Sequence, residues 1–118
     1  GSNSNGDWIK FSDGTMIQVL RVTETRSVST LETNVNFGTT SGNMYIYNDT
    51  SLRYWMSSFI DVPFVVSQND KPPMCWVITN TKEAGSLTKN GFKLQFIHFT
   101  TDQTTFETMI IAIGRWKE

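Results

Sequence analysis

Phe106-Glu107-Thr108-Met109-Ile110-Ile111-Ala112-Ile113-Gly114-Arg115-Trp116-Lys117 is the stretch that decides the fold of this chain. Side chains alternate between the two faces of a β-strand. One face of this stretch carries the odd-numbered residues from Glu107 to Arg115, and the other carries Thr108, Ile110 and Ala112. Both faces are apolar in the middle. This pattern predicts a strand that is central to a sandwich or is covered by a neighbouring subunit.

A β-hairpin is predicted at the other end of the chain. Residues 8–11 and 16–22 are short apolar runs that flank Asp13-Gly14. An Asp-Gly pair between apolar runs favours a tight hairpin turn, because glycine tolerates a positive φ.

Further short apolar runs are separated by polar turns. Phe92, Leu94 and Phe96 share one face of an alternating run, which we assign to the core, and His98 stands where this run meets a loop. Pro63 lacks an N–H group and is expected at a strand start, an edge or a bulge. No window has a helical period, so seven or so short strands predict an all-β fold, a small antiparallel β-sandwich. The other runs are residues 44–47, 52–56, 59–67 and 74–79.

Size and charge narrow the classes of function. The chain has 118 residues and a mass of 13.4 kDa, which predicts one domain. A net charge of −1 without a basic cluster argues against nucleic acid as a partner. No apolar run approaches the roughly 20 residues of a spanning helix, which argues against membrane insertion. The single cysteine, Cys75, excludes a disulfide framework, and we interpret it as a small buried side chain.

The first six residues differ in composition from the remainder. Gly1-Ser2 resembles a cloning remnant, and residues 3–6 are expected to form a flexible lead-in. We therefore place a single β-sandwich domain at residues 7–118. We expect this domain to be the C-terminal tip of a longer protein whose other part lies upstream.

No catalytic arrangement emerges from the sequence. One histidine cannot build a His-rich metal site within one chain, and no nucleophile elbow is present. The carboxylates stand singly in loops and do not form the pair that glycoside cleavage needs. We expect no enzymatic activity, no catalytic residue, no cofactor and no metal. His98 is interpreted as a partly buried side chain; three copies near a symmetry axis would instead chelate an ion or make a pH-sensitive contact.

Aromatic residues near strand ends and loops are the candidates for ligand contact. A sugar presents a C–H surface to an aromatic ring and exchanges hydrogen bonds with Asn, Asp and Arg side chains. Packing in the core or in a subunit interface is the alternative, and for Trp116 we expect that it covers the base of the sandwich. The candidate ligand-binding residues are Arg53, Tyr54, Trp55, Trp76, His98, Phe99 and Asp102.

Two parts of the chain resemble the C-terminal domains of bacteriophage tail fibres. Residues 5–18, from Asn5-Gly6-Asp7-Trp8-Ile9-Lys10-Phe11 to Ile17-Gln18, resemble the opening of those domains. Residues 59–66, 90–92 and 111–117 resemble the later parts of the same pattern. The resemblance implies an H-type-lectin-like sandwich that assembles as a homotrimer. It also implies a location on the virion, at the distal end of a tail fibre.

The resemblance further implies a function in host attachment. In H-type lectins the sugar site lies near a subunit boundary and uses an aromatic–histidine pair that is followed shortly by aspartate. His98-Phe99 and Asp102 resemble this arrangement, with Phe99 in place of the usual tryptophan and Asp102 displaced by one residue. The expected function is a receptor-binding tip that recognises a bacterial surface polysaccharide, with three sites giving avidity.

Three alternatives remain open at this stage. The domain could be a structural trimerisation or end-cap domain of the fibre, without direct receptor binding. It could be a polysaccharide-degrading tip, although the missing acid pair argues against this. A cellular H-type lectin is the third alternative, against which stand the opening hairpin and the ending Gly114–Lys117.

Overall fold

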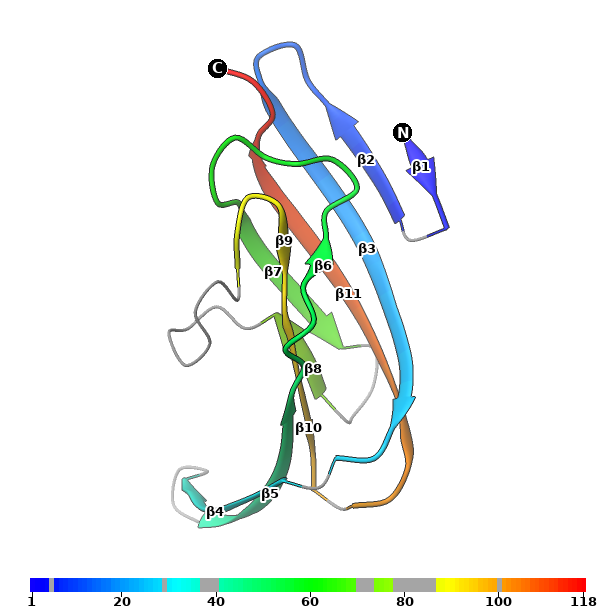
Figure 1. The fold of residues 1–118 in the computed structure, drawn as a ribbon, viewed down its shortest axis with the longest axis vertical. Coiled ribbons are helices and arrows are strands. Elements are labelled where there is room, and N and C mark those ends of the chain that lie inside the picture. Colours follow the sequence, from blue (N-terminus) through cyan, green and yellow to red (C-terminus); the bar gives the residue numbers. More distant parts are fainter. Residues whose placement is uncertain (5, 29, 37–40, 70–73, 78–86, 100) are drawn as a thin grey trace.

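The protein is all-β in the part of the chain that the structure describes, which is residues 1–118 without 5, 29, 37–40, 70–73, 78–86 and 100. The computed structural model has an elongated shape of 48 × 27 × 26 Å with two main antiparallel sheets (Figure 1). The all-β prediction is confirmed, and the arrangement is consistent with a small β-sandwich. The strands are β1 (Ser2–Asn3), β2 (Gly6–Lys10), β3 (Thr15–Arg26), β4 (Thr30–Asn36), β5 (Ser41–Asn48), β6 (Arg53–Tyr54), β7 (Phe64–Asn69), β8 (Met74–Val77), β9 (Gly91–Phe92), β10 (Leu94–His98) and β11 (Thr104–Arg115).

The larger sheet has the strand order β1-β2-β3-β11-β7, in which β11 lies between two neighbouring strands. β11 pairs with β3 along its whole length and with β7 on its other edge. The side chains of Phe106, Ile110 and Ala112 face inward and are fully buried. The opposite face is only half-buried at Ile111, and Ile113 is 40% exposed. Burial on both faces, which the sequence pattern predicted, is therefore not reached within one chain.

The predicted opening hairpin is confirmed. β2 pairs with β3 from Lys10↔Met16 to Gly6↔Leu20. Gly14 has a φ of 96°, the left-handed region that favours glycine, and the N–H of Thr15 donates to Asp13 Oδ1 over 2.8 Å. This turn fixes the register that brings alternate residues of β3 to the core.

The Gly-Arg-Trp-Lys ending closes on this same turn. Trp116 donates from Nε1 to the carbonyl of Phe11 over 3.0 Å and from its backbone N–H to the carbonyl of Gly14 over 2.9 Å. Arg115 donates to the carbonyl of Asp13 over 2.9 Å. Trp116 is half-buried against the core, as the sequence analysis expected.

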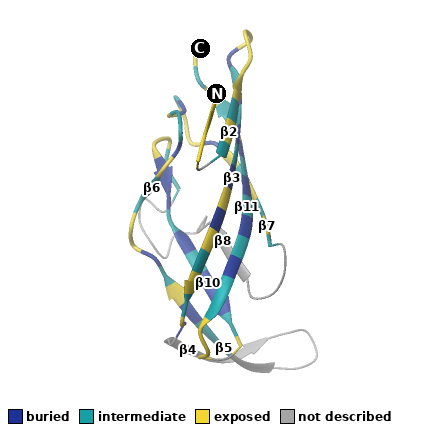
Figure 2. Ribbon diagram, turned by 90° about the vertical axis from the view of Figure 1, so that its right-hand side faces the viewer, coloured by how far each residue is buried: buried dark blue, intermediate teal, exposed yellow. Residues whose placement is uncertain are grey.

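The second main sheet has the order β4-β5-β10-β8, and β6 pairs with β9 in a short ribbon. Phe92, Leu94 and Phe96 are buried, which confirms their assignment to the core, and Ile97 on the opposite face of β10 is buried as well. Figure 2 shows buried and more exposed residues alternating along β3 and β11. Pro63 immediately precedes β7, as expected, whereas residues 59–63 lie outside the strand predicted for 59–67.

Gln18 is a fully buried polar side chain in β3. Its Oε1 accepts a hydrogen bond from the backbone N–H of Met56 over 3.0 Å, and its Nε2 donates to the carbonyl of Ser57. These bonds tie the loop after β6 to the larger sheet. The Gln18 amide therefore helps to position this loop, together with the backbone N–H groups of Trp55 and Phe59, which donate to the carbonyls of Asn90 and Lys89.

Ser2–Asn3 form strand β1 at the edge of the larger sheet, and the flexibility expected for residues 3–6 stays a prediction. β1 pairs with β2 through Ser2↔Asp7 and Asn3↔Gly6. The backbone N–H of Trp8 also donates to the carbonyl of Gly1 over 2.8 Å. Backbone pairing places these residues at the edge of the sheet although they contribute no apolar side chain to the core.

Candidate functional site

A hollow of about 210 Å³ lies between β3 of the larger sheet and the β6–β9 ribbon. β2 stops pairing with β3 at Gly6↔Leu20, so the next residues of β3 form an edge without β2 beside them. Leu20, Val22 and Phe92 are buried and form an apolar floor. The other lining residues are Arg21, Arg53 and Tyr54.

Tyr54 presents the most accessible aromatic surface of this hollow. Its side chain is 72% exposed, whereas Phe92 on the paired strand β9 is buried. An exposed tyrosine ring offers both a flat apolar face and a hydroxyl group. Next to an apolar floor and two guanidinium groups, this ring can hold a small amphipathic ligand such as a sugar residue.

Arg53 is held in place by a network of charged side chains. Its Nη2 donates to Asp49 Oδ2 over 3.0 Å and also to Glu24 Oε1. Arg26 pairs with Glu24 and lies 3.8 Å from Asp49 Oδ2. The Arg26 guanidinium also lies 4.2 Å from the ring centroid of Phe96, within the range of a cation–π contact. The network joins β3 to β6 and to the end of β5 at one side of the hollow.

The charged forms of Asp49 and Arg53 stabilise each other. Burial tends to raise the pKa of Asp49, but hydrogen bonds from Ser51 and Arg53 and the positive charge of Arg53 outweigh it, so the pKa is lowered. Burial tends to lower the pKa of Arg53, but its bonds to Glu24 and Asp49 outweigh burial and raise that pKa. Arg53 therefore stays positively charged at the edge of the hollow.

Arg21 differs from the other arginines in its contacts. Arg26 and Arg53 face carboxylates, and Arg115 donates to a backbone carbonyl. Within the described part of the chain, no acceptor is assigned to the exposed guanidinium of Arg21. Arg21 is therefore the donor that the hollow can offer to an incoming ligand.

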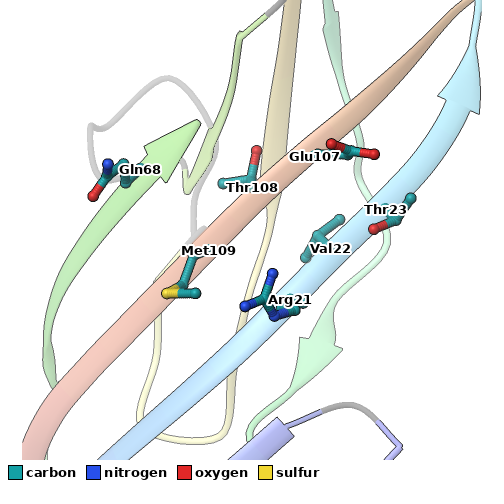
Figure 3. A pocket seen from close by; sticks show the side chains of 7 residues that line it. All are labelled: Arg21, Val22, Thr23, Gln68, Glu107, Thr108 and Met109. Atoms are coloured by element: carbon teal, nitrogen blue, oxygen red, sulfur yellow. The ribbon is translucent and has the colours of Figure 1, made fainter. Parts of the chain in front are cut away.

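A second hollow, of about 450 Å³, lies along β3, β11 and β7. Figure 3 shows Arg21 and Met109 side by side, with Thr23 and Glu107 further along the same two strands and Gln68 on β7. Arg21 and Val22 line both hollows, so the two adjoin at this point of β3. Arg21 was not among the residues predicted from the sequence. The signal that could have found it is a positive charge at an odd, outward position within the mostly apolar residues 16–22.

Of the seven predicted ligand-binding residues, the structure brings Arg53 and Tyr54 together at the hollow. Trp55 does not line the hollow: its side chain is only 5% exposed, and its ring centroid lies 4.5 Å from that of Phe92. Its Nε1 donates to the carbonyl of Thr88 over 2.9 Å. Trp55 is thus packed in the core, whereas the preceding Tyr54 faces solvent. Trp76 lies in β8, opposite Gln95, and its side chain is outside the described part of the structure.

His98, Phe99 and Asp102 lie at a different place. Phe92 pairs with Arg53 whereas His98 pairs with Tyr45, so β9 and β10 separate the two groups by about 20 Å at roughly 3.3 Å per residue. The half-buried His98 ring stacks edge-on to Phe106 with centroids 6.4 Å apart, and Phe99 is 53% exposed. Within one chain, these residues and Tyr54 do not form a single site.

No family model matches the chain, and no curated protein or solved structure is significantly similar to it. The described residues contain no group of three or more His, Cys, Asp or Glu side chains that could hold a metal ion. They also include no helix with the length and apolar character needed to cross a membrane. The candidate site therefore has to be judged from its own geometry.

Proposed function

We propose that this domain is a non-enzymatic, homotrimeric receptor-binding tip of a phage tail fibre, located at the distal end of the virion, which recognises a bacterial surface polysaccharide. The observation that carries the binding part of this proposal is the hollow beside Tyr54. It combines an exposed aromatic ring and an apolar floor, with Arg21 and Arg53 among its lining residues. The resemblance of residues 5–18 and 111–117 to tail-fibre domains supports the viral context.

The size of the hollow suits one residue of a longer polymer. A volume of about 210 Å³ is below the roughly 300–1,000 Å³ of pockets that enclose drug-sized ligands. One sugar ring would stack on Tyr54 while Arg21 donates to its hydroxyl or carboxylate oxygens. The remainder of the polymer would stay in solvent. Such a site binds weakly by itself, and several copies on one repetitive glycan raise the overall affinity by about 10²–10⁴.

Binding to purified polysaccharides from bacterial envelopes tests this proposal. The Tyr54→Ala variant is expected to lose binding, because it removes the exposed ring without touching the core. Phe99→Ala is the matched control, since Phe99 is also exposed but lies at the other end of β10. Loss of binding in Phe99→Ala with full binding in Tyr54→Ala would move the site to the His98–Asp102 loop.

A structural end cap that fixes the assembly of the fibre is the second candidate function. The central strand β11 favours it, because its outward face carries Ile111 and Ile113. Adsorption of a fibre that lacks residues 7–118 distinguishes receptor binding from the end-cap function. Continued adsorption of a trimeric fibre to host cells would place receptor binding elsewhere.

A further inference from the structure

The outward face of the larger sheet carries a row of apolar side chains across four strands. Residues that pair directly across neighbouring strands point to the same face. The register Ile9↔Ile17, Ile17↔Ile113 and Ile113↔Phe64 therefore aligns four apolar side chains from β2 to β7. Ile9 is 59% exposed and Phe64 is 71% exposed. The ends of this row are thus open to solvent.

A second row runs beside the first. Val19 pairs with Ile111, and Ile111 pairs with Val66, which is 49% exposed. Asp7 ends this row on β2, opposite Val19. The two rows form one continuous apolar surface, which we call the outer apolar face: Ile9, Ile17, Val19, Phe64, Val66, Ile111 and Ile113. Monomeric proteins rarely expose contiguous apolar patches larger than a few hundred Å².

We infer that the outer apolar face is the contact surface between copies of this chain. The apolar rows cross four strands, a width near 19 Å at about 4.8 Å per strand. β2 and β7 have only 5 and 6 residues, so the rows form the centre of the contact, and the longer strands β3 and β11 extend it with polar residues.

The charges on the same sheet face favour a second copy as the occupant. Beyond the apolar rows, Arg21 lies opposite Met109, and the exposed Asp7 stands at the end of the second row. An exposed acid and an exposed base on one face can each meet the opposite charge on a neighbouring copy, and polar residues around an apolar centre are the usual anatomy of an interface. A net charge of −1 leaves little repulsion between copies. The outer apolar face would be the contact surface of the proposed homotrimer, so this inference rests on the proposed assembly and not on the proposed glycan binding.

The arrangement also places the ligand hollow relative to the interface. The 450 Å³ hollow lies between the outward side chains of β3, β11 and β7 and would be covered by the neighbouring copy. Tyr54 lies on the far side of Arg21, in the hollow that opens at the free edge of β3. Assembly through the outer apolar face therefore leaves Tyr54 accessible.

Sedimentation of two matched variants tests the inference. Phe64 and Tyr54 are 71% and 72% exposed, so a glutamate at either position disturbs the isolated chain equally little. The wild-type chain is expected to sediment at a multiple of 13.4 kDa, and Phe64→Glu to shift toward 13.4 kDa. Its dissociation constant should rise about tenfold or more, because a charge would replace an apolar anchor in the interface. Tyr54→Glu should sediment as the wild type does.

Two further variants, Val66→Lys and Ile9→Lys, replace Phe64→Glu if it does not give a folded chain by circular dichroism. A wild-type chain that sediments at 13.4 kDa at all concentrations overturns the inference. So does an unchanged assembly in all folded outer-face variants. The interface and the glycan site can fail independently. An assembled protein that binds no glycan would contradict the proposed glycan binding and leave the interface intact. A monomer that binds glycan through Tyr54 would contradict the interface and leave the glycan site intact.

Discussion

Replacement of Gln18 by methionine is expected to lower the free energy of unfolding by about 2–4 kcal/mol, because two backbone groups lose their partners. Methionine has nearly the same length and volume as glutamine, so no cavity forms. The N–H of Met56 and the carbonyl of Ser57 are the groups that Gln18 satisfies. Each buried group that is left without a partner costs about 1–3 kcal/mol, and the lower half applies because both loop positions are only half-buried.

Thermal and urea unfolding followed by circular dichroism measure this effect. Against a total stability of roughly 5–15 kcal/mol, the loss is large and lowers the melting temperature by roughly 10 °C. Gln103→Met is the matched control, since Gln103 is exposed, and its effect should stay within about 0.5 kcal/mol. If Gln18→Met were as stable as Gln103→Met, the loop after β6 would not depend on Gln18, and the reasoning would be refuted.

Three other substitutions follow from the same structure. Gly14→Ala should lower the stability by about 1–2 kcal/mol, because φ is 96° and a Cβ would lie 2.7 Å from the carbonyl oxygen of Lys117; unchanged urea unfolding would contradict the turn. Trp55→Ala should cost about 3–5 kcal/mol, since the ring is buried against Phe92, and a stable variant that loses only ligand binding would restore Trp55 to the site. The pKa of Asp49 in the folded state lies below its unfolded value of 3.8. The ionised Asp49 therefore adds to the free energy of unfolding above pH 3.8, and this stabilisation is lost as the pH falls through the folded-state pKa. Urea unfolding across acidic pH should therefore show a smaller loss in Asp49→Asn than in the wild type, and equal losses would contradict this assignment.

The elements that the sequence predicted well are those with strong local signals. Asp13-Gly14 and the alternation in β11 specify a turn and a strand within a few residues, and both are found. The same alternation in β3 places Met16, Gln18 and Leu20 on one face, and all three are buried. The two-residue alternation of β3 could therefore have predicted that Gln18 is buried, if it had been applied to polar residues as well as to apolar ones.

The candidate site was only partly predictable, because it depends on contacts between distant segments. Arg53 meets Glu24, 29 residues away in the chain, and no local pattern indicates this pairing. Adjacent aromatic residues also diverge: Tyr54 faces solvent whereas Trp55 is buried. Both residues are aromatic and were assigned the same role, and only their opposite burial in the folded chain separates them.

The outer apolar face and the hollow beside Tyr54 meet on β3, because successive side chains of β3 point to opposite faces of the sheet. Its even-numbered residues from Met16 to Val22 are buried in the core, and its odd-numbered residues from Ile17 to Thr23 face outward. Where β2 stops at Leu20, the edge of β3 becomes free and the hollow beside Tyr54 begins. Arg21 stands at this transition and lines both hollows. A substitution of Arg21 would thus affect assembly and ligand binding together, whereas Phe64 and Tyr54 touch one surface each and can separate them.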